Sequence, residues 1–358
     1  MSHFRLLKQT RQMTEFSCGA SALQSVLNYW GSDVDEEALM AILGTNDEVG
    51  TYPENLVSGA RTLGFDAEFR ENVTLDELQQ YTSGGHPVIA LGQLWRSEKD
   101  TPASASDEWD CGHYIVILSV DADYVYFQDP FIRMGKGFMP RAAFEEHWHQ
   151  VMGGSALAKS PKLNHLAIFV KGHKPAVPSV GSGTERLDLA GRLGSINAIS
   201  FHFSRYLLPF DFLDELRKLF GESLVRPDAF ALLRKDSEGR ISAMQGGRLE
   251  DVGDIIAVNA LIAIATAGET AEEAASSRAK AAAMAAASGD FGLAADDLKR
   301  RAERLDPGHS EVIVLLENRW ELRLKEITDR YGGKITSERL VPATAFEALD
   351  KAFVSLKT

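Results

Sequence analysis

The sequence predicts an α+β domain in its first half and a separate α/β domain in its second half. Three observations lead to this prediction. The chain has 358 residues, more than one hydrophobic core usually supports. In the first half helical patterns come first and strand patterns follow, an order typical of α+β folds. A segment rich in Pro, Gly and Ser then interrupts the apolar periodicity. We therefore expect a first domain over residues 1–173, a linker over 174–186 and a second domain over 187–358.

The first domain begins with helices. One is predicted over 18–30, where Ala22, Val26 and Trp30 recur at helical spacing and Gly31 ends the segment. The other predicted helices cover 35–43, 53–63, 74–81 and 141–149. The predicted strands are alternating or apolar runs at 65–70, 86–95, 113–120, 124–128 and 165–170.

The second domain alternates strands and helices. Its predicted strands cover 195–203, 229–234, 241–245, 311–316 and 334–341, and its predicted helices cover 210–220, the Ala-rich run 251–304, 319–331 and a segment from 343 onward. This alternation predicts an α/β sandwich with ferredoxin-like βαβ units. The Asp, Glu and His residues of this half lack metal-ligand spacing. We expect a regulatory or oligomerisation role, through contact with a second copy or a protein partner.

Composition and charge narrow the class of protein. Hydrophobic residues make up 44% and charged residues 25%, as in ordinary globular proteins. The net charge of −13 argues against nucleic acid or an anionic membrane surface as a partner. No run approaches the roughly 20 apolar residues of a spanning helix. Two cysteines do not make a disulfide framework, which favours the cytoplasm. No motif indicates a cofactor or a metal.

Cys18 is the leading candidate for a nucleophile. It stands in the first turn of the predicted helix, where the positive end of the helix macrodipole favours a thiolate. Gly19 follows and lets another backbone or a substrate come close. A cysteine taken alone is more often a small buried residue. The assignment therefore depends on partners elsewhere in the sequence.

His113 and Asp129 are the candidate partners, as general base and as the residue that orients it. His113 begins an apolar strand, and Asp129 ends the next strand just before Pro130. Residues 121–123 form a turn, and the resulting hairpin register predicts that the two side chains lie side by side at its open end. An aspartate there can accept the Nδ1 proton and hold the tautomer that faces the thiol. The alternative for Asp129 is an Asp-Pro turn cap.

Gln12 supplies a fourth candidate, because it lies six residues before Cys18 and carries an amide donor. With the backbone N–H of Cys18 it could hold a developing oxyanion. The segments around these four residues read QMTEFSCGA, CGHYIVIL and YFQDPF. They resemble the cysteine peptidases that process double-glycine leader peptides of bacteriocins, a branch of the papain-like fold. The segments GTYPENLVSGARTLGFDAEF, HPVIALGQLW and GFMPRAAFEEHW extend the resemblance over nearly all of the first half.

The resemblance implies a papain-like domain in which Gln12 serves the oxyanion, Cys18 is the nucleophile, His113 the base and Asp129 its orienter. The expected function is peptide-bond hydrolysis, with a peptide or protein as substrate. Transfer of the acyl group to an amine and peptide binding without turnover remain alternatives. The best-known members are fused to membrane-spanning export transporters, and no segment of this sequence is predicted to span a membrane. The chain therefore looks more like stand-alone soluble relatives.

Cys111, two residues before His113, is either a packing residue or a redox partner for Cys18.

Overall fold

The structure is a computed structural model that separates into two compact units, Met1–Val177 and Pro178–Thr358. The division falls inside the segment that the sequence predicts as a linker, and that linker lies outside the described residues. The structure describes residues 7–8, 10–94, 109, 112–131, 135–151, 162–173, 196–206, 212, 215–216, 218, 227–247, 293–317 and 327–341.

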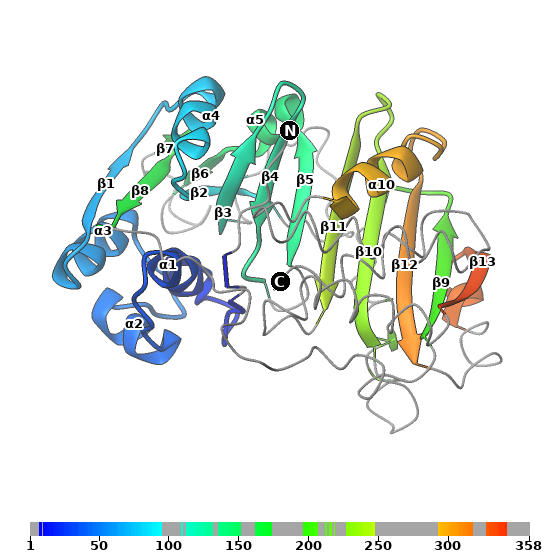
Figure 1. Ribbon diagram of the computed structural model, residues 1–358, viewed down its shortest axis with the longest axis horizontal. Coiled ribbons are helices and arrows are strands. Elements are labelled where there is room, and N and C mark those ends of the chain that lie inside the picture. Colours follow the sequence, from blue (N-terminus) through cyan, green and yellow to red (C-terminus); the bar gives the residue numbers. More distant parts are fainter. Residues whose placement is uncertain are drawn as a thin grey trace, which may run out of the picture. The chain divides into compact units, whose positions relative to one another are not determined.

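Unit 1 consists of helices around an antiparallel sheet (Figure 1). The sheet order is β1-β8-β2-β3-β4-β5, with bounds β1 Asp66–Arg70, β8 Ala167–Lys171, β2 Val88–Gln93, β3 Gly112–Val120, β4 Tyr124–Gln128 and β5 Lys136–Pro140. A separate pair is formed by β6 (His149–Val151) and β7 (Lys162–Asn164). The helices are α1 (Cys18–Tyr29), α2 (Glu36–Leu43), α3 (Pro53–Thr62), α4 (Leu75–Ser83) and α5 (Arg141–His147).

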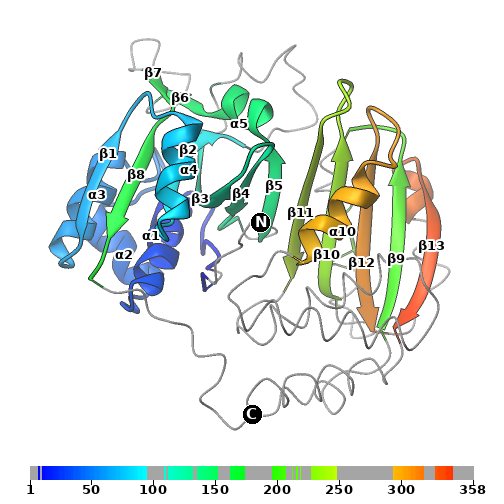
Figure 2. The same cartoon turned by 45° about the horizontal axis from the view of Figure 1, so that its top comes forward.

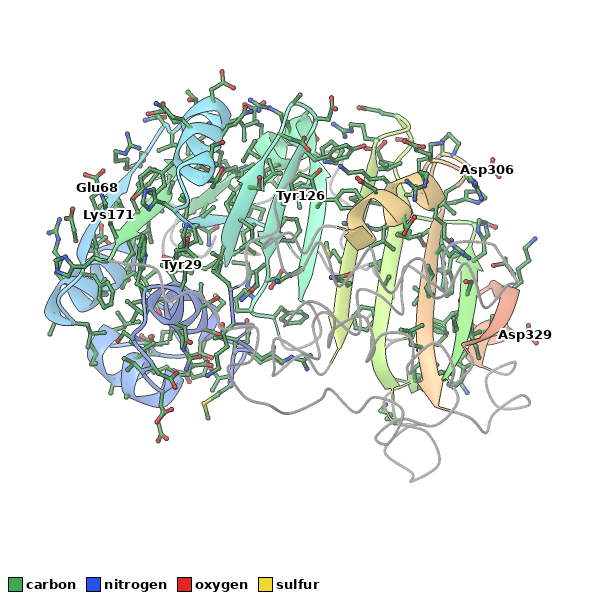
Figure 3. The ribbon with its side chains drawn as sticks, in the orientation of Figure 1. Tyr29, Glu68, Tyr126, Lys171, Asp306 and Asp329 are labelled. Carbon is green, nitrogen blue, oxygen red and sulfur yellow. The ribbon has the colours of Figure 1, made fainter. Side chains whose placement is uncertain are left out.

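Helix α1 is the central helix of this unit. Its Leu23 and Val26 are fully buried, as are Ile115 and Ile117 of β3, and both α1 and α4 pack against β3 (Figure 2). Burying each such side chain contributes roughly 2 kcal/mol of hydrophobic stabilisation. At the far end of α1 the hydroxyl of Tyr29 donates a 2.5 Å hydrogen bond to the carbonyl of Gly85, which follows α4 (Figure 3). The helix is thus fixed against the sheet along its length.

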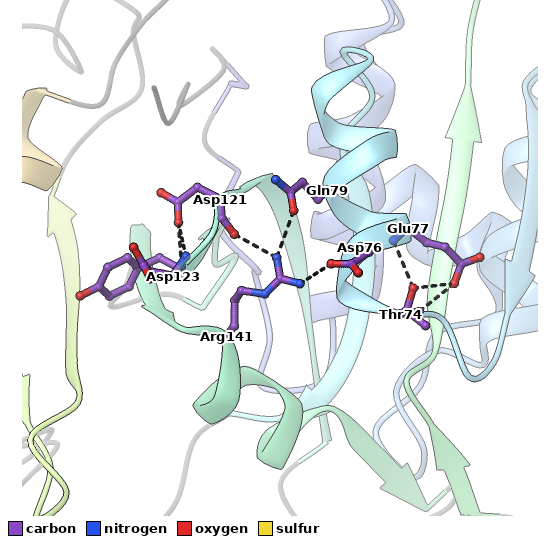
Figure 4. Close-up of polar contacts among 8 residues, drawn as sticks. Thr74, Asp76, Glu77, Gln79, Asp121, Asp123 and Arg141 are labelled. Atoms are coloured by element: carbon purple, nitrogen blue, oxygen red, sulfur yellow. Dashed lines mark hydrogen bonds and ion pairs between the residues drawn. The ribbon is translucent and has the colours of Figure 1, made fainter.

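The turn of the β3–β4 hairpin is held by Arg141, the first residue of α5 (Figure 4). Its guanidinium donates to Oδ1 of Asp76 at 2.6 Å, to Oε1 of Gln79 at 3.1 Å and to the carbonyl of Asp121 at 3.0 Å. Exposed ion pairs of this kind add little stability, but here one planar donor group joins α4, α5 and the hairpin turn. This fixes the end of the hairpin that lies away from His113.

Unit 2 is an antiparallel sheet in the order β11-β10-β12-β9-β13, with bounds β11 Ile241–Gly247, β10 Pro227–Lys235, β12 Ser310–Glu317, β9 Ile196–Phe203 and β13 Gly333–Val341. Helix α10 (Leu293–Ala302) packs on β10 and β11. Phe201 and Phe203 belong to a buried apolar cluster with Phe212, Val312 and Val314. The predicted strands of this half are present. Helix α10 lies within the predicted Ala-rich helix over 251–304. Residues 251–292 of that prediction, and the predicted last helix from 343 onward, lie outside the described residues.

The ferredoxin-like arrangement predicted for this half is not confirmed. A βαββαβ unit accounts for four strands, whereas β13 adds a fifth that pairs with β9. In a ferredoxin-like unit the third strand lies between the first and the second, whereas here the fourth strand of the series, β12, lies between β9 and β10. The helix and strand patterns of the sequence predict the elements, but lateral strand order depends on long-range pairing. Among the described residues of either unit, no helix is long and apolar enough to cross a membrane.

Candidate active site

Cys18 is the first residue of α1, and its side chain is partly exposed. The residue before it, Ser17, occupies the N-cap position without capping the helix through its side chain. The first-turn N–H groups of a helix have no partners within the helix, and the positive end of the macrodipole lies among them. The structure therefore places the thiol where a thiolate, or an oxyanion formed beside it, is stabilised.

Gly19 is the residue that lets the start of α1 approach the sheet. A Cβ atom on Gly19 would lie 3.0 Å from Cβ of Thr51 and 3.2 Å from a ring carbon of Tyr114. Tyr114 follows His113 on β3, and its hydroxyl donates a 3.0 Å hydrogen bond to the carbonyl of Thr51. The sequence analysis expects another backbone or a substrate at Gly19, but the atoms closest to it are those of these two side chains. This close approach draws the N-terminus of α1 toward the strand that carries His113.

His113 and Asp129 are in direct contact. Nε2 of His113 lies 2.7 Å from Oδ1 of Asp129, and the exposed fractions of the two residues are 6% and 1%. His113 lies in β3, opposite Gly92 of β2. Asp129 directly follows β4. A buried imidazole and a buried carboxylate at this distance form a charge-assisted hydrogen bond.

The hairpin register explains why these two side chains meet. Val116 of β3 pairs with Gln128 of β4, so the position opposite His113 is residue 131, and Asp129 lies diagonally from it on the same face. The ring of Phe131 lies edge-on to the imidazole, with centroids 6.2 Å apart. The predicted neighbourhood at the open end of the hairpin is therefore present.

The ring nitrogen that faces the carboxylate differs from the one expected. The sequence analysis assigns Nδ1 to Asp129, but the structure places Nε2 there. The imidazole also hydrogen-bonds with the side chain of Cys18. The imidazole thus contacts Asp129 and the side chain of Cys18, and it meets the carboxylate through Nε2 and not through Nδ1.

The electrostatics of the site favour a protonated His113. Burial lowers the pKa of His113, but the charge of Asp129 and the hydrogen bonds to Asp129 and Cys18 outweigh it and raise the pKa to about 10. A charged Cys18 acts in the same direction. At neutral pH the site therefore favours an imidazolium, which pairs with the carboxylate on one side and faces the sulfur on the other.

Gln12 lies on the loop that leads into α1 and is 3% exposed. Its backbone N–H donates a 2.8 Å hydrogen bond to the carbonyl of Pro130, the residue after Asp129. Its side-chain Nε2 donates to the carbonyl of Thr14 at 2.8 Å. An amide nitrogen carries two hydrogens, so one is engaged by the loop and the second can serve another acceptor.

Sequence reasoning missed Glu36, a buried carboxyl group that contacts this loop. Its Oε1 accepts a 2.8 Å hydrogen bond from the backbone N–H of Met13. Acidic residues at a helix start are common because the macrodipole favours them, so the sequence offered no signal of burial.

Cys111 lies outside the described residues, and the structure does not bear on its predicted redox role. Among the described residues, no His, Cys, Asp and Glu group could hold a metal ion.

Residues 7–153 match the Peptidase C39 family. These residues, within unit 1, therefore form a Peptidase C39 domain, and the members of this family are cysteine peptidases with a papain-like fold. Over 175 residues the chain is 25% identical to the lactococcin-G-processing and transport ATP-binding protein LagD of Lactococcus lactis subsp. lactis. The alignment covers 48% of this chain and 20% of LagD. The chain thus spans about a fifth of the length of that curated relative.

Solved structures of peptidase domains are similar to about half of the chain. The peptidase domain of Streptococcus ComA, a bi-functional ABC transporter involved in quorum sensing, is 20% identical, with a TM-score of 0.35, and covers 48% of this chain and 100% of its own. A putative C39-like peptidase from Bacillus anthracis is 18% identical, with a TM-score of 0.35, and the alignment covers 49% of this chain and 100% of that peptidase. A double glycine motif protease from an AMS/PCAT transporter, solved with a leader peptide, is 17% identical, with a TM-score of 0.34. The alignment covers 48% of this chain and 99% of that protease.

Proposed function

We propose that the chain hydrolyses peptide bonds through a triad of Cys18, His113 and Asp129, with the amide of Gln12 in the oxyanion hole. The observation that carries this proposal is the buried imidazole of His113, which bonds with Asp129 at 2.7 Å on one side and with the Cys18 side chain on the other. Such a constellation activates a thiol nucleophile and orients its base. Its position in a Peptidase C39 domain supports the same chemistry.

In the acylation step the Cys18 thiolate attacks the carbonyl carbon of the scissile peptide bond. The bond from carbon to sulfur forms as the carbonyl oxygen becomes an oxyanion. The raised pKa of His113, about 10, means that the imidazole already holds the proton that the leaving amine needs. Transfer of this proton to the amine nitrogen lets the carbon–nitrogen bond break. The product is a thioester at Cys18 and a free amine.

The oxyanion is held by N–H donors at the start of α1. The backbone N–H of Cys18 is one donor, and the second hydrogen of the Gln12 amide is the other. The first hydrogen is engaged by the carbonyl of Thr14, which fixes the orientation of the amide before substrate arrives. Donors that are oriented in advance lower the barrier because they need no rearrangement when charge develops.

Deacylation completes the cycle. The neutral imidazole of His113 takes a proton from water, and the resulting hydroxide attacks the thioester carbon. The thiolate leaves and His113 is again an imidazolium. An amine in place of water would give acyl transfer. A cleft that captures peptides without attack by Cys18 would instead be a peptide-binding module. The contacts of His113 with Asp129 and Cys18 favour catalysis over binding without turnover.

We also propose that the substrate resembles the peptides of the relatives. LagD is named for processing lactococcin G, and the AMS/PCAT protease is a double glycine motif protease solved with a leader peptide. A peptide cleaved after two glycines is therefore the first substrate class to test. The compartment we propose is the cytoplasm, since two cysteines do not make a disulfide framework. The second unit, proposed to span 187–358, is assigned a regulatory or oligomerisation role.

A direct test uses fluorogenic peptides that end in Gly-Gly before the reporter amine. We expect the full chain to release the reporter, Cys18→Ala to lose release, and Cys111→Ser, which changes the other cysteine, to retain it. Mass spectrometry in the presence of hydroxylamine separates the outcomes: a free acid indicates hydrolysis and a hydroxamate indicates capture of the thioester. Binding without release, or full turnover by Cys18→Ala, contradicts the proposal.

A further inference from the structure

Glu36 is buried at a place where a carboxylate is ordinarily exposed. It is the first residue of α2, and its exposed fraction is 5%, whereas the side chain of Glu37 in the same helical turn is exposed. An acid at a helix start gains from the macrodipole while it remains in solvent. Burying the carboxylate costs free energy that the helix itself does not require, and this burial raises the pKa of Glu36. The contacts of Glu36 show what its burial achieves.

The partners of Glu36 belong to the loop that precedes Cys18. Oε1 of Glu36 accepts a 2.8 Å hydrogen bond from the backbone N–H of Met13. The hydroxyl of Ser17, which donates to the carbonyl of Thr14 at 3.2 Å, is near the same carboxyl group and opposes the rise of its pKa. Met13 directly follows Gln12, and Ser17 directly precedes Cys18. The carboxyl group of Glu36 thus holds the start of the segment between the amide and the nucleophile, and the hydroxyl of Ser17 ties the end of that segment to Thr14.

The loop is also anchored from the opposite side and within itself. The backbone N–H of Gln12 donates to the carbonyl of Pro130, next to Asp129. Inside the loop, the N–H of Thr14 donates a 3.0 Å hydrogen bond to Oγ of Ser17. The side chain of Met13 is 62% exposed, so packing does not hold that residue. Its backbone is held through Glu36 and through its neighbour Gln12.

We propose that Glu36 is a positioning residue of the active site, which fixes the 12–17 loop so that the Gln12 amide and the Cys18 N–H point to one oxyanion position. The inference rests on the proposed function, because it assigns Glu36 an effect on catalysis through Gln12. Glu36 touches neither substrate nor the reacting atoms. Its contribution lies in removing the freedom of the loop, since donors that are aligned in advance are the ones that stabilise a transition state.

The first test compares three variants of the full chain. Glu36→Ala removes the acceptor for the Met13 N–H, and we expect kcat to fall on the order of 10-fold or more with little change in KM, because the lost alignment acts in the transition state. Glu36→Gln keeps an amide oxygen in the same place and should recover most of this loss. Glu37→Ala, in the same turn but exposed, should behave as the unchanged chain.

The second test asks whether Glu36 acts through Gln12. In a double-mutant cycle, Glu36→Ala should have little further effect once Gln12→Ala is present, since the aligned donor is already gone. A peptide aldehyde, whose adduct with the thiol places an oxygen in the oxyanion hole, should bind more weakly to Glu36→Ala. The alkylation of Cys18 by iodoacetamide needs no oxyanion hole, and its rate should stay within about threefold.

Three results bear on the inference in different ways. Equal kcat values for Glu36→Ala and Glu37→Ala overturn it, as do fully additive effects of Glu36→Ala and Gln12→Ala. The inference is also overturned if the rate of Cys18 alkylation and the affinity for the peptide aldehyde both fall to a similar extent in Glu36→Ala and in Glu36→Gln, because this result indicates general misfolding. The proposed function fails separately, if Cys18→Ala retains turnover. Circular dichroism and the thermal midpoint of each variant establish that the compared proteins are folded.

Discussion

Oδ1 of Asp129 accepts a hydrogen bond from Nε2 of His113, and the two atoms are 2.7 Å apart. The same oxygen accepts a 2.7 Å hydrogen bond from the backbone N–H of Phe131. The other oxygen, Oδ2, is buried and has no hydrogen-bond partner among the described residues. One carboxylate oxygen therefore orients the imidazole, and the backbone of the following turn orients that oxygen.

This arrangement predicts that Asp129→Asn is milder than Asp129→Ala. The asparagine keeps an Oδ1 acceptor, and the Phe131 N–H selects the amide rotamer that presents it to His113. The loss of the carboxylate charge should lower the pKa of His113 from about 10, so the alkaline limit of activity should move to lower pH. We expect kcat/KM to fall on the order of 100-fold or more in the alanine variant, as for loss of general acid–base catalysis, and to fall less in the asparagine variant. Steady-state pH profiles measure both effects, and equal losses without a pH shift contradict the orienting role.

Gln12 is predicted to act through its amide hydrogens. Gln12→Ala should lower kcat about 100-fold, or about 3 kcal/mol, if the amide donates to the oxyanion. Gln12→Glu has nearly the same shape but presents a carboxylate oxygen to the oxyanion and to the Thr14 carbonyl, so we expect a larger loss. Steady-state kinetics measure kcat for the unchanged chain and for both variants, and thermal unfolding shows whether the compared proteins are equally stable. Unchanged turnover in both variants removes Gln12 from the site.

Gly19 is predicted to be required for the position of α1. In Gly19→Ala the added Cβ would lie 3.0 Å from Thr51 and 3.2 Å from Tyr114, which is tighter than ordinary contact, so the helix start has to move away from β3. We expect a loss of roughly 1 kcal/mol in the free energy of unfolding, as for other overpacked sites. A larger relative loss in turnover should follow, because Cys18 moves from His113. Urea unfolding and kcat/KM measure the two effects, and full activity with normal stability contradicts this packing argument.

Much of unit 1 could be predicted from the sequence because its signals are local. The hairpin of β3 and β4 follows from two apolar runs around Asp121 and Asp123, and its register brings His113 near Asp129. Strand β5 was missed because Lys136, Gly137 and Pro140 are poor strand residues. It forms because its backbone pairs with β4. The pair β6–β7 was missed because each strand has only three residues.

The details of the site depend on contacts that no local pattern encodes. The sequence identifies an imidazole and a carboxylate as neighbours, but the nitrogen that faces Asp129 depends on how the ring is packed. For the same reason Glu36 was not singled out, since its burial results from the docking of α2 beside the 12–17 loop. In unit 2 the strand order could not be predicted from local sequence patterns, because the pairing of β10 with β12 joins segments about 80 residues apart.

The most direct test of the central claim is the pH dependence of Cys18 alkylation by iodoacetamide, followed by intact-mass analysis. The pKa of His113 is raised to about 10, so the imidazolium that pairs with the thiolate is present at neutral pH and is lost only as the pH rises through about 10. We predict rapid single labelling at neutral pH. In His113→Ala we predict slow labelling that rises around pH 8.5, as for an ordinary thiol. Slow labelling with the same pH profile in both proteins would contradict the account.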